Sequence, residues 1–283
     1  MGATFWLLEA PDSLAEQSRR NPDGYGLAAF GEDGRPRIAK RPAAAYEDER
    51  FAREARHESS RTFVAHVRYA SSGGLTVENT HPFEQGGRVF AHRGYIGDLE
   101  ALDSRLGEHR ELVRGDTDSE RLFALITKEI EAAGGDVEAG IAAAVRWVAR
   151  ELPLYSLNFV LASATDIWAF RYPESHVLRM LERAGGGPSG ERHLDAASRA
   201  GTVRVRSASL ASQASVIFAS EQMDEDDGWR MLEVGELVHV GGDLRVRSLV
   251  AFDEQPAQLV RLEHLDPRAA ASLREAAPLG STY

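Results

Sequence analysis

The sequence predicts an α+β fold, because helices and strands are grouped along the chain and do not alternate. Two helical segments follow one another at about 117–133 and 137–151, and apolar runs of strand length come after them. A doubly wound parallel sheet would require strands and helices to alternate regularly. The grouping therefore favours α+β layers over that architecture.

The first half of the chain mixes one early helix with strands and loops. Asp12 or Ser13 is placed to cap a helix through Arg20, and the turn residues Asn-Pro-Asp-Gly at 21–24 end it. Two apolar runs predict strands with a Ser-Ser-Gly-Gly loop between them. The strands are 61–68 and 88–92, and the loop is 71–74.

The middle of the chain predicts two helices. The first begins at Thr117 and places one row of apolar side chains on a single face as far as about Ala133. That row consists of Leu122, Leu125, Ile126 and Ile130. The second runs from about Val137 to Glu151 and stops before Pro153.

The second half is rich in predicted strands and turns. The apolar runs 157–163 and 167–172 predict a hairpin, and 185–190 is a glycine-rich loop. Further strands are expected at 202–207, 216–220, 237–240 and 244–252. With no internal repeat, the chain is interpreted as one domain, 1–283, with a motif-bearing part to about 150 and a strand-rich part from 151.

Composition excludes several classes of function. The chain has 283 residues, 43% of them hydrophobic, and a formal charge of −11, which disfavours nucleic acid and anionic membranes as partners. No apolar run approaches the ~20 residues of a membrane-spanning helix, and no signal-peptide pattern is present, so a cytoplasmic location is expected. The 283 residues include no cysteine, so they cannot form a disulfide, bind a metal through a thiolate or supply a thiol nucleophile.

Two charged residues are candidates for substrate binding. Asp118 lies at the start of a predicted helix, where Thr117 and Glu120 form a capping box that explains much of the local pattern without any function. As a fixed carboxylate it could instead hold an α-ammonium group. Arg68 ends a predicted strand, and its guanidinium fork suits a carboxylate better than a lysine does. Together they could bind both ends of a free amino-acid backbone.

No metal or cofactor site is predicted. His66, His81 and His92 come from separate segments without the spacing of metal ligands, and structural histidines are the expected interpretation. The acidic stretch 224–227 lacks the alternating ligands of a calcium loop, and a solvated turn is expected there.

Several segments, in this order, resemble the glutamine pocket of the class II glutamine amidotransferases, in particular single-domain bacterial members. The segments are 21–26, His66-Val67-Arg68-Tyr69-Ala70, Asn79-Thr80-His81-Pro82-Phe83, His92-Arg93-Gly94 and 115–120, with weaker similarity at 220–221 and 228–229. The resemblance implies a four-layer αββα sandwich of the N-terminal nucleophile hydrolase type, here lacking its first strand.

The resemblance also implies site residues. Arg68 would hold the substrate α-carboxylate, Asp118 the α-ammonium, and Gly94 would supply an N–H to an oxyanion within a tight turn at 92–94. Asn79 and His81 would belong to the wall of the pocket. The ligand would be glutamine or another γ-glutamyl compound, with a separate synthase subunit as a possible partner.

The sequence departs from the family in two ways. The family attacks the side-chain amide with an N-terminal cysteine that precedes an apolar strand, and neither is present here. Two interpretations remain open: an enzyme whose true start lies upstream, hydrolysing glutamine or a γ-glutamyl amide, or a non-catalytic descendant that acts as an amino-acid sensor or as a subunit for a partner.

The second departure is Arg93, which replaces a neutral amide donor in the oxyanion segment. A partly buried guanidinium needs a carboxylate or a bound anion. We expect Arg93 either to pair with Asp118 and block the pocket or to extend into solvent.

Overall fold

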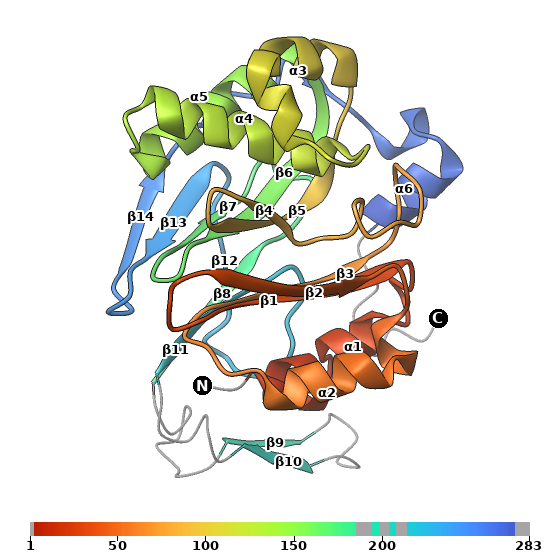
Figure 1. Cartoon of the computed structure of the whole chain (residues 1–283), viewed down its shortest axis with the longest axis vertical. Coiled ribbons are helices and arrows are strands. Elements are labelled where there is room, and N and C mark those ends of the chain that lie inside the picture. The colour runs from red at the N-terminus through yellow and green to blue at the C-terminus, as the bar shows by residue number, and fades with distance from the viewer. Residues whose placement is uncertain (1–2, 185–193, 198–203, 208–213, 275–283) are drawn as a thin grey trace.

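The helices and sheets form four layers in the order helix, sheet, sheet, helix (Figure 1). The computed structural model describes residues 3–184, 194–197, 204–207 and 214–274. One outer layer holds α3, α4 and α5, and the other holds α1 and α2. The bounds are α1 Leu14–Gln17, α2 Glu49–His57, α3 Leu99–Leu106, α4 Asp118–Ala132, α5 Val137–Glu151 and α6 Pro267–Leu273. The predicted αββα sandwich is confirmed.

The larger sheet has seven strands and lies beneath α3, α4 and α5. Its order is β14-β13-β7-β6-β5-β4, all antiparallel, and β15 adds to β6 in parallel. The strands are β4 Phe83–Gln85, β5 Arg88–Ile96, β6 Pro153–Ala162, β7 Ile167–Phe170, β13 Glu236–Val240, β14 Val246–Val250 and β15 Gln258–Leu259. The longest pairing, between β5 and β6, forms the floor of the site described below.

The second sheet layer consists of two separate three-stranded antiparallel sheets. Their orders are β2-β1-β3 and β11-β8-β12, so β3 and β11 are both edge strands among the described residues. The strands are β1 Gly24–Phe30, β2 Pro36–Arg41, β3 Phe63–Arg68, β8 Arg179–Arg183, β11 Ser215–Ala219 and β12 Arg230–Met231. A further pair is formed by β9 Leu194–Ala197 and β10 Arg204–Ser207.

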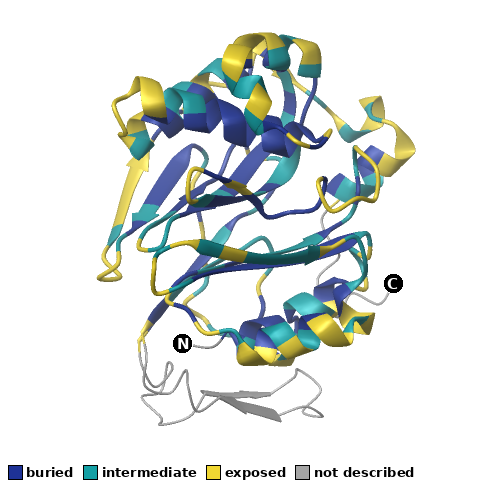
Figure 2. Cartoon of the chain, in the orientation of Figure 1, coloured by how far each residue is buried: buried dark blue, intermediate teal, exposed yellow. Residues whose placement is uncertain are grey.

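The main core lies between α4, α5 and the larger sheet, where residues coloured as buried face one another (Figure 2). The apolar row predicted for the first of these helices, from Leu122 to Ile130, is 0–1% exposed. A second core packs Tyr25 and Leu27 of β1 against Phe51 of α2. Both faces of the sandwich are thus anchored by apolar packing, which is the largest favourable contribution to folding.

Local capping explains where the helices begin. Thr117 Oγ1 accepts a hydrogen bond from Glu120 N at 3.2 Å, as the capping box predicts. The Glu120 carboxylate reaches two residues further back than the N-cap residue and accepts from Gly115 N at 2.7 Å. Ser13 caps α1, but this helix ends at Gln17 and turns carry the chain to Arg20, so it is shorter than predicted.

Three further predictions need correction or lie wholly or partly outside the described residues. The segment 92–94 is not a turn, because β5 continues through it to Ile96. Of the predicted strand 202–207 only 204–207 is described, and the predicted loop at 185–190 lies outside the described residues.

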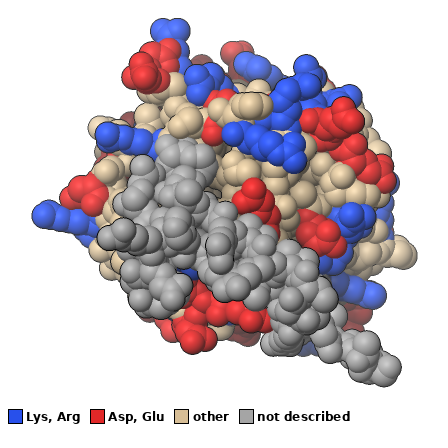
Figure 3. Space-filling model, turned by 90° about the horizontal axis from the view of Figure 1, so that it is seen from below, with Lys and Arg blue, Asp and Glu red and all other residues tan. Residues whose placement is uncertain are grey.

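Acidic and basic side chains are interspersed over the visible part of the face that carries α1 and α2 (Figure 3). Ion pairs at the protein surface include Arg37–Glu58 and Arg50–Glu54. Within the described ranges, no helix is long and apolar enough to cross a membrane.

Candidate active site

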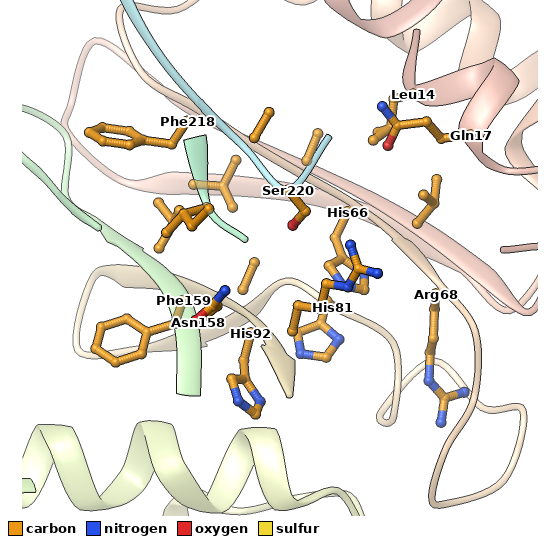
Figure 4. A pocket seen from close by; sticks show the side chains of 18 of the residues that line it. Leu14, Gln17, His66, Arg68, His81, His92, Asn158, Phe159, Phe218 and Ser220 are labelled. Atoms are coloured by element: carbon orange, nitrogen blue, oxygen red, sulfur yellow. The ribbon is translucent and has the colours of Figure 1, made fainter. Parts of the chain in front are cut away.

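A cavity of about 320 Å³ lies between the two sheet layers (Figure 4). β3 and β11 line it from one layer, β5 and β6 from the other, and the first residues of α4 close one part of it. Arg68, His81, Gly94 and Asp118, which the sequence places far apart, all line this cavity.

Arg68 is the last residue of β3 and is only 4% exposed. Its guanidinium donates to the carbonyl oxygens of Ser72, at 2.6 Å, and Gly74, at 3.2 Å. Burial lowers the pKa of Arg68, while Asp23 and Asp118 act in the opposite direction. The loop that follows β3 therefore holds a buried cation in one orientation.

Asp118 is the first residue of α4 and is also 4% exposed. Its Oδ2 accepts a hydrogen bond from Ile96 N at 2.9 Å, and its Oδ1 has a longer contact of 3.4 Å with the Ser119 hydroxyl. A carboxylate at a helix start is stabilised by the helix dipole. The structure thus brings a fixed carboxylate to the cavity that Arg68 lines.

His92 of β5 contacts both α4, through Ser119, and β6, through Ser156. Its Nε2 is 3.3 Å from Ser156 O, which can only accept, so Nε2 carries the proton. Its Nδ1 then accepts from the Ser119 hydroxyl, 2.9 Å away. Burial lowers the pKa of His92, although Asp118 opposes the shift. The sequence pattern carried no signal for this Ser119–His92 pair.

The rings of His66 and His81 are in contact, tilted by 32° with centroids 4.3 Å apart, and both residues line the cavity (Figure 4). Burial lowers the pKa of His66 to about 3 and that of His81 well below its usual range, and the nearby Arg68 adds to both shifts. Both rings are therefore neutral at pH 7. No group of three acidic or histidine side chains in the described part of the chain is arranged to hold a metal ion.

Gly94 is required by close packing and not by an unusual backbone angle. A Cβ atom there would lie 2.0 Å from Ser156 O and 2.4 Å from His92 Nε2. Gly94 pairs with Leu157 within the β5–β6 ladder. A side chain at position 94 would therefore clash with β6 and with His92.

Arg93 lies against Glu221, with Nη1 and Oε1 3.9 Å apart, and its Nη2 is 3.4 Å from Arg274 O. Glu221 also pairs with Arg20 at 2.7 Å. The contacts of Asp118 are to Ile96 and Ser119, so the expected blocking pair between Arg93 and Asp118 is not formed. Nor does Arg93 extend fully into solvent, since its side chain is 22% exposed.

Asn79 lies behind the site and is not among the residues that line the cavity. Its amide accepts from Asp116 N at 2.7 Å and donates to Gly74 O at 3.3 Å. Asn79 therefore links two segments by hydrogen bonds: the loop whose carbonyl groups bind Arg68, and the turn that precedes α4. This is a positioning contact and not the pocket-wall placement that the sequence suggested.

The model of the family described as glutamine amidotransferases class-II matches residues 12–260. The chain belongs to this family. Its match extends from α1 to β15 and so includes Arg68, Arg93 and Asp118.

Known proteins from three organisms are similar to this family member. "Probable glutamine amidotransferase DUG3" of Saccharomyces cerevisiae is 31% identical over 139 residues, which are 44% of this chain and 39% of the yeast protein. A glutamine aminotransferase class-II domain protein from Silicibacter pomeroyi has a TM-score of 0.54 at 20% identity, covering 82% of this chain and 92% of that one. Glutamine phosphoribosylpyrophosphate amidotransferase from B. subtilis has a TM-score of 0.59 at 17% identity. The similarity covers 86% of this chain and 46% of the B. subtilis chain.

These similarities differ in what they establish. The match to the yeast relative spans well under half of that protein's length. The structural similarities are below 25% identity and concern the fold. The four-layer sandwich and the family are therefore shared, whereas substrate and activity have to be argued from this chain's own site.

Proposed function

We propose that this amidotransferase-family protein binds glutamine or a γ-glutamyl compound through the free amino-acid end of the ligand. The observation that carries the proposal is the pair of opposite, buried charges lining one cavity, Arg68 and Asp118. Each is fixed in place by hydrogen bonds to the protein, so little side-chain freedom would be lost on binding. The proposal places the protein in the cytoplasm, where free amino acids are available.

The two charges would recognise complementary groups. The Arg68 fork would bind the α-carboxylate by two parallel N–H···O bonds. Asp118 would accept from the α-ammonium through Oδ1, because Oδ2 is occupied by Ile96 N. The side-chain amide of the ligand would then extend toward β5, where Gly94 lines the cavity and could supply an oxyanion N–H.

The chain as given contains no cysteine, so it holds no thiol that could attack an amide. Within the proposal it binds its ligand without forming a thioester. The second candidate, an amino-acid sensor or a subunit for a separate synthase, is favoured by Arg93 in the oxyanion segment, where the family has a neutral amide donor. Accordingly, ammonia release from glutamine should not exceed that of a heat-inactivated control.

Calorimetric titration tests the proposal with three ligands that differ by one group. L-Glutamine should bind, whereas N-acetylglutamine, which lacks the ammonium, and glutamine α-amide, which lacks the carboxylate, should each bind at least ~10-fold more weakly, about 1.4 kcal/mol. Equal affinity for all three ligands would contradict recognition of both ends. Absence of any binding by glutamine and γ-glutamyl peptides would remove the proposal.

A further inference from the structure

The helix α6 forms part of the wall of the site but lies outside the family match. The match ends at residue 260, and α6 begins at Pro267. Ser272 and Leu273 of this helix line the cavity that Arg68 also lines. Figure 1 shows α6 at one end of the sandwich, between the levels of the two sheet layers. A helix that the family match does not include therefore borders the proposed ligand.

The beginning of α6 lies near the amino-acid end of the proposed ligand. Burial raises the pKa of Tyr95, and the carboxylates of Asp118 and Asp266 both add to this rise, so both lie near the Tyr95 side chain. Burial lowers the pKa of Arg68, and the guanidinium of Arg268 lowers it further. Charges at the start of α6 thus reach the surroundings of both Arg68 and Asp118.

The end of α6 lies near the side-chain end of the proposed ligand. The carbonyl oxygen of Arg274, the residue that follows the helix, accepts a hydrogen bond from Arg93 Nη2 at 3.4 Å. Leu273 O accepts from His176 Nε2. Arg93 stands next to Gly94, toward which the side-chain amide of the ligand would extend. The helix therefore spans the site from one end of the ligand to the other.

α6 is buried against the protein but buries little apolar surface. Ala269, Ala270 and Leu273 are 1–5% exposed, yet none of them belongs to the apolar cores of the described residues. Two of these three side chains are single methyl groups, so the apolar contribution to docking is small. The Arg268 side chain is 57% exposed, and an exposed ion pair adds little. Segments with few buried apolar contacts open locally at a low free energy.

Arg268 connects α6 to the loop that holds Arg68. Its Nε donates to Ala70 O at 3.0 Å, and Asp23 Oδ2 accepts from Ala70 N at 2.9 Å. Ala70 stands between Arg68 and Ser72, whose carbonyl oxygen binds the Arg68 guanidinium. A ligand on Arg68 would restrict this loop and would also lie against the end of α6. Occupancy of the site and docking of α6 should therefore favour each other.

We propose that α6 is a movable cover of the amino-acid site, which detaches to let the ligand enter and closes over it once bound. Closing elements of this kind sequester a bound ligand from water and delay its release. The inference rests on the proposed function for the identity of the ligand. The docking of α6 itself rests on the contacts of Arg268, His176 and Arg93.

Hydrogen exchange tests whether the ligand closes the cover. With saturating glutamine, the amides of 269–273 should exchange at least ~3-fold more slowly than in the free protein. The amides of α3, which does not line the cavity, should exchange equally in both. Calorimetric titration of the same samples establishes that glutamine is bound. Bound glutamine with unchanged exchange in α6 would overturn the proposal.

A thiol reporter tests the cover without any ligand. Because the 283 residues contain no cysteine, Ser119→Cys places a single thiol in the cavity wall, at a position that is 5% exposed. Arg268→Gln removes the contacts of α6 with Ala70 and Asp23. Alkylation by the neutral reagent iodoacetamide should then be at least ~3-fold faster than with Ser119→Cys alone. Loss of a nearby cation lowers the thiolate fraction, so an electrostatic effect would act in the opposite direction.

Arg150→Gln is the matched control, because the Arg150 side chain is 51% exposed and pairs with Glu254 outside the cavity. It should leave the alkylation rate unchanged. The cover is overturned if Arg268→Gln is alkylated at the same rate as the protein without this change, or if Arg150→Gln raises the rate equally. If glutamine does not bind, the proposed function fails, and the alkylation rates alone decide whether α6 covers the cavity.

Discussion

Asp118 Oδ2 accepts a hydrogen bond from the backbone N–H of Ile96 at 2.9 Å, which ties the first residue of α4 to the last residue of β5. The β5–β6 pairing shifts its register between Tyr95 and Ile96, so the carboxylate binds β5 where the ladder is irregular. One oxygen of Asp118 thus supports the fold. The other is available to the cavity.

Substituting Asp118 should separate these two contributions. Asp118→Asn keeps an oxygen that can accept from Ile96 N but loses the charge, so glutamine affinity should fall at least ~10-fold while the melting temperature stays close to that of the parent. Asp118→Ala leaves the buried amide without an acceptor and should also lower the free energy of unfolding by about 1–3 kcal/mol. Calorimetric titration and thermal unfolding measure the two effects.

Asp136 offers a matched control, because its carboxylate also caps a helix, accepting from Ala139 N at 3.0 Å, but lies outside the cavity. Asp136→Asn should not change glutamine affinity. If Asp118→Asn bound glutamine as tightly as the parent, Asp118 would have only the structural contact to Ile96.

Arg68→Lys should weaken the binding of any ligand with a free α-carboxylate, since the charge remains but the bidentate fork is lost. A loss of ~10-fold or more is expected by calorimetric titration with glutamine or a γ-glutamyl peptide. Arg110→Lys is the control: Arg110 also donates to a backbone carbonyl, that of Val113, but does not line the cavity. Unchanged affinity in Arg68→Lys would exclude Arg68 from the ligand site.

The sequence predicted α4 because its apolar row follows one helical period, and it predicted the end of α5 from Pro153. The grouping of elements predicted the α+β class, and the resemblance to the family implied the four layers. It missed β1, in which every residue is buried, because β1 lacks the alternation that marks a half-exposed strand. It missed the Ser119–His92 contact because these residues are 27 positions apart and meet only when α4 packs on β5. Glycine at position 94 suggested a turn, whereas contact with the Ser156 carbonyl is what excludes a side chain.

Arg93→Asn should leave glutamine affinity within about threefold of the parent, a difference below ~1 kcal/mol. Arg93 lies against Glu221, and Asp118 is held by Ile96 and Ser119, so removing the guanidinium frees no binding group. Calorimetric titration of the variant checks this. Clearly tighter binding would show that Arg93 competes with the ligand for Asp118 in solution.

The last prediction concerns stability in acid and follows from the buried histidines. Burial lowers the pKa of His66 from 6.5 to about 3, so the unfolded chain binds a proton on this side chain throughout that interval and the folded protein does not. Stability therefore rises with pH across this window and is lost as the pH falls below 6.5. Between pH 7 and pH 5 the loss due to His66 should be roughly 1–2 kcal/mol.

His66→Phe removes this titration, so the difference in unfolding free energy between pH 7 and pH 5 should shrink by that amount in denaturant unfolding. It should not vanish, because burial also lowers the pKa values of His81, His92 and His176. An identical pH dependence in His66→Phe and the parent would mean that His66 is not held neutral by the fold.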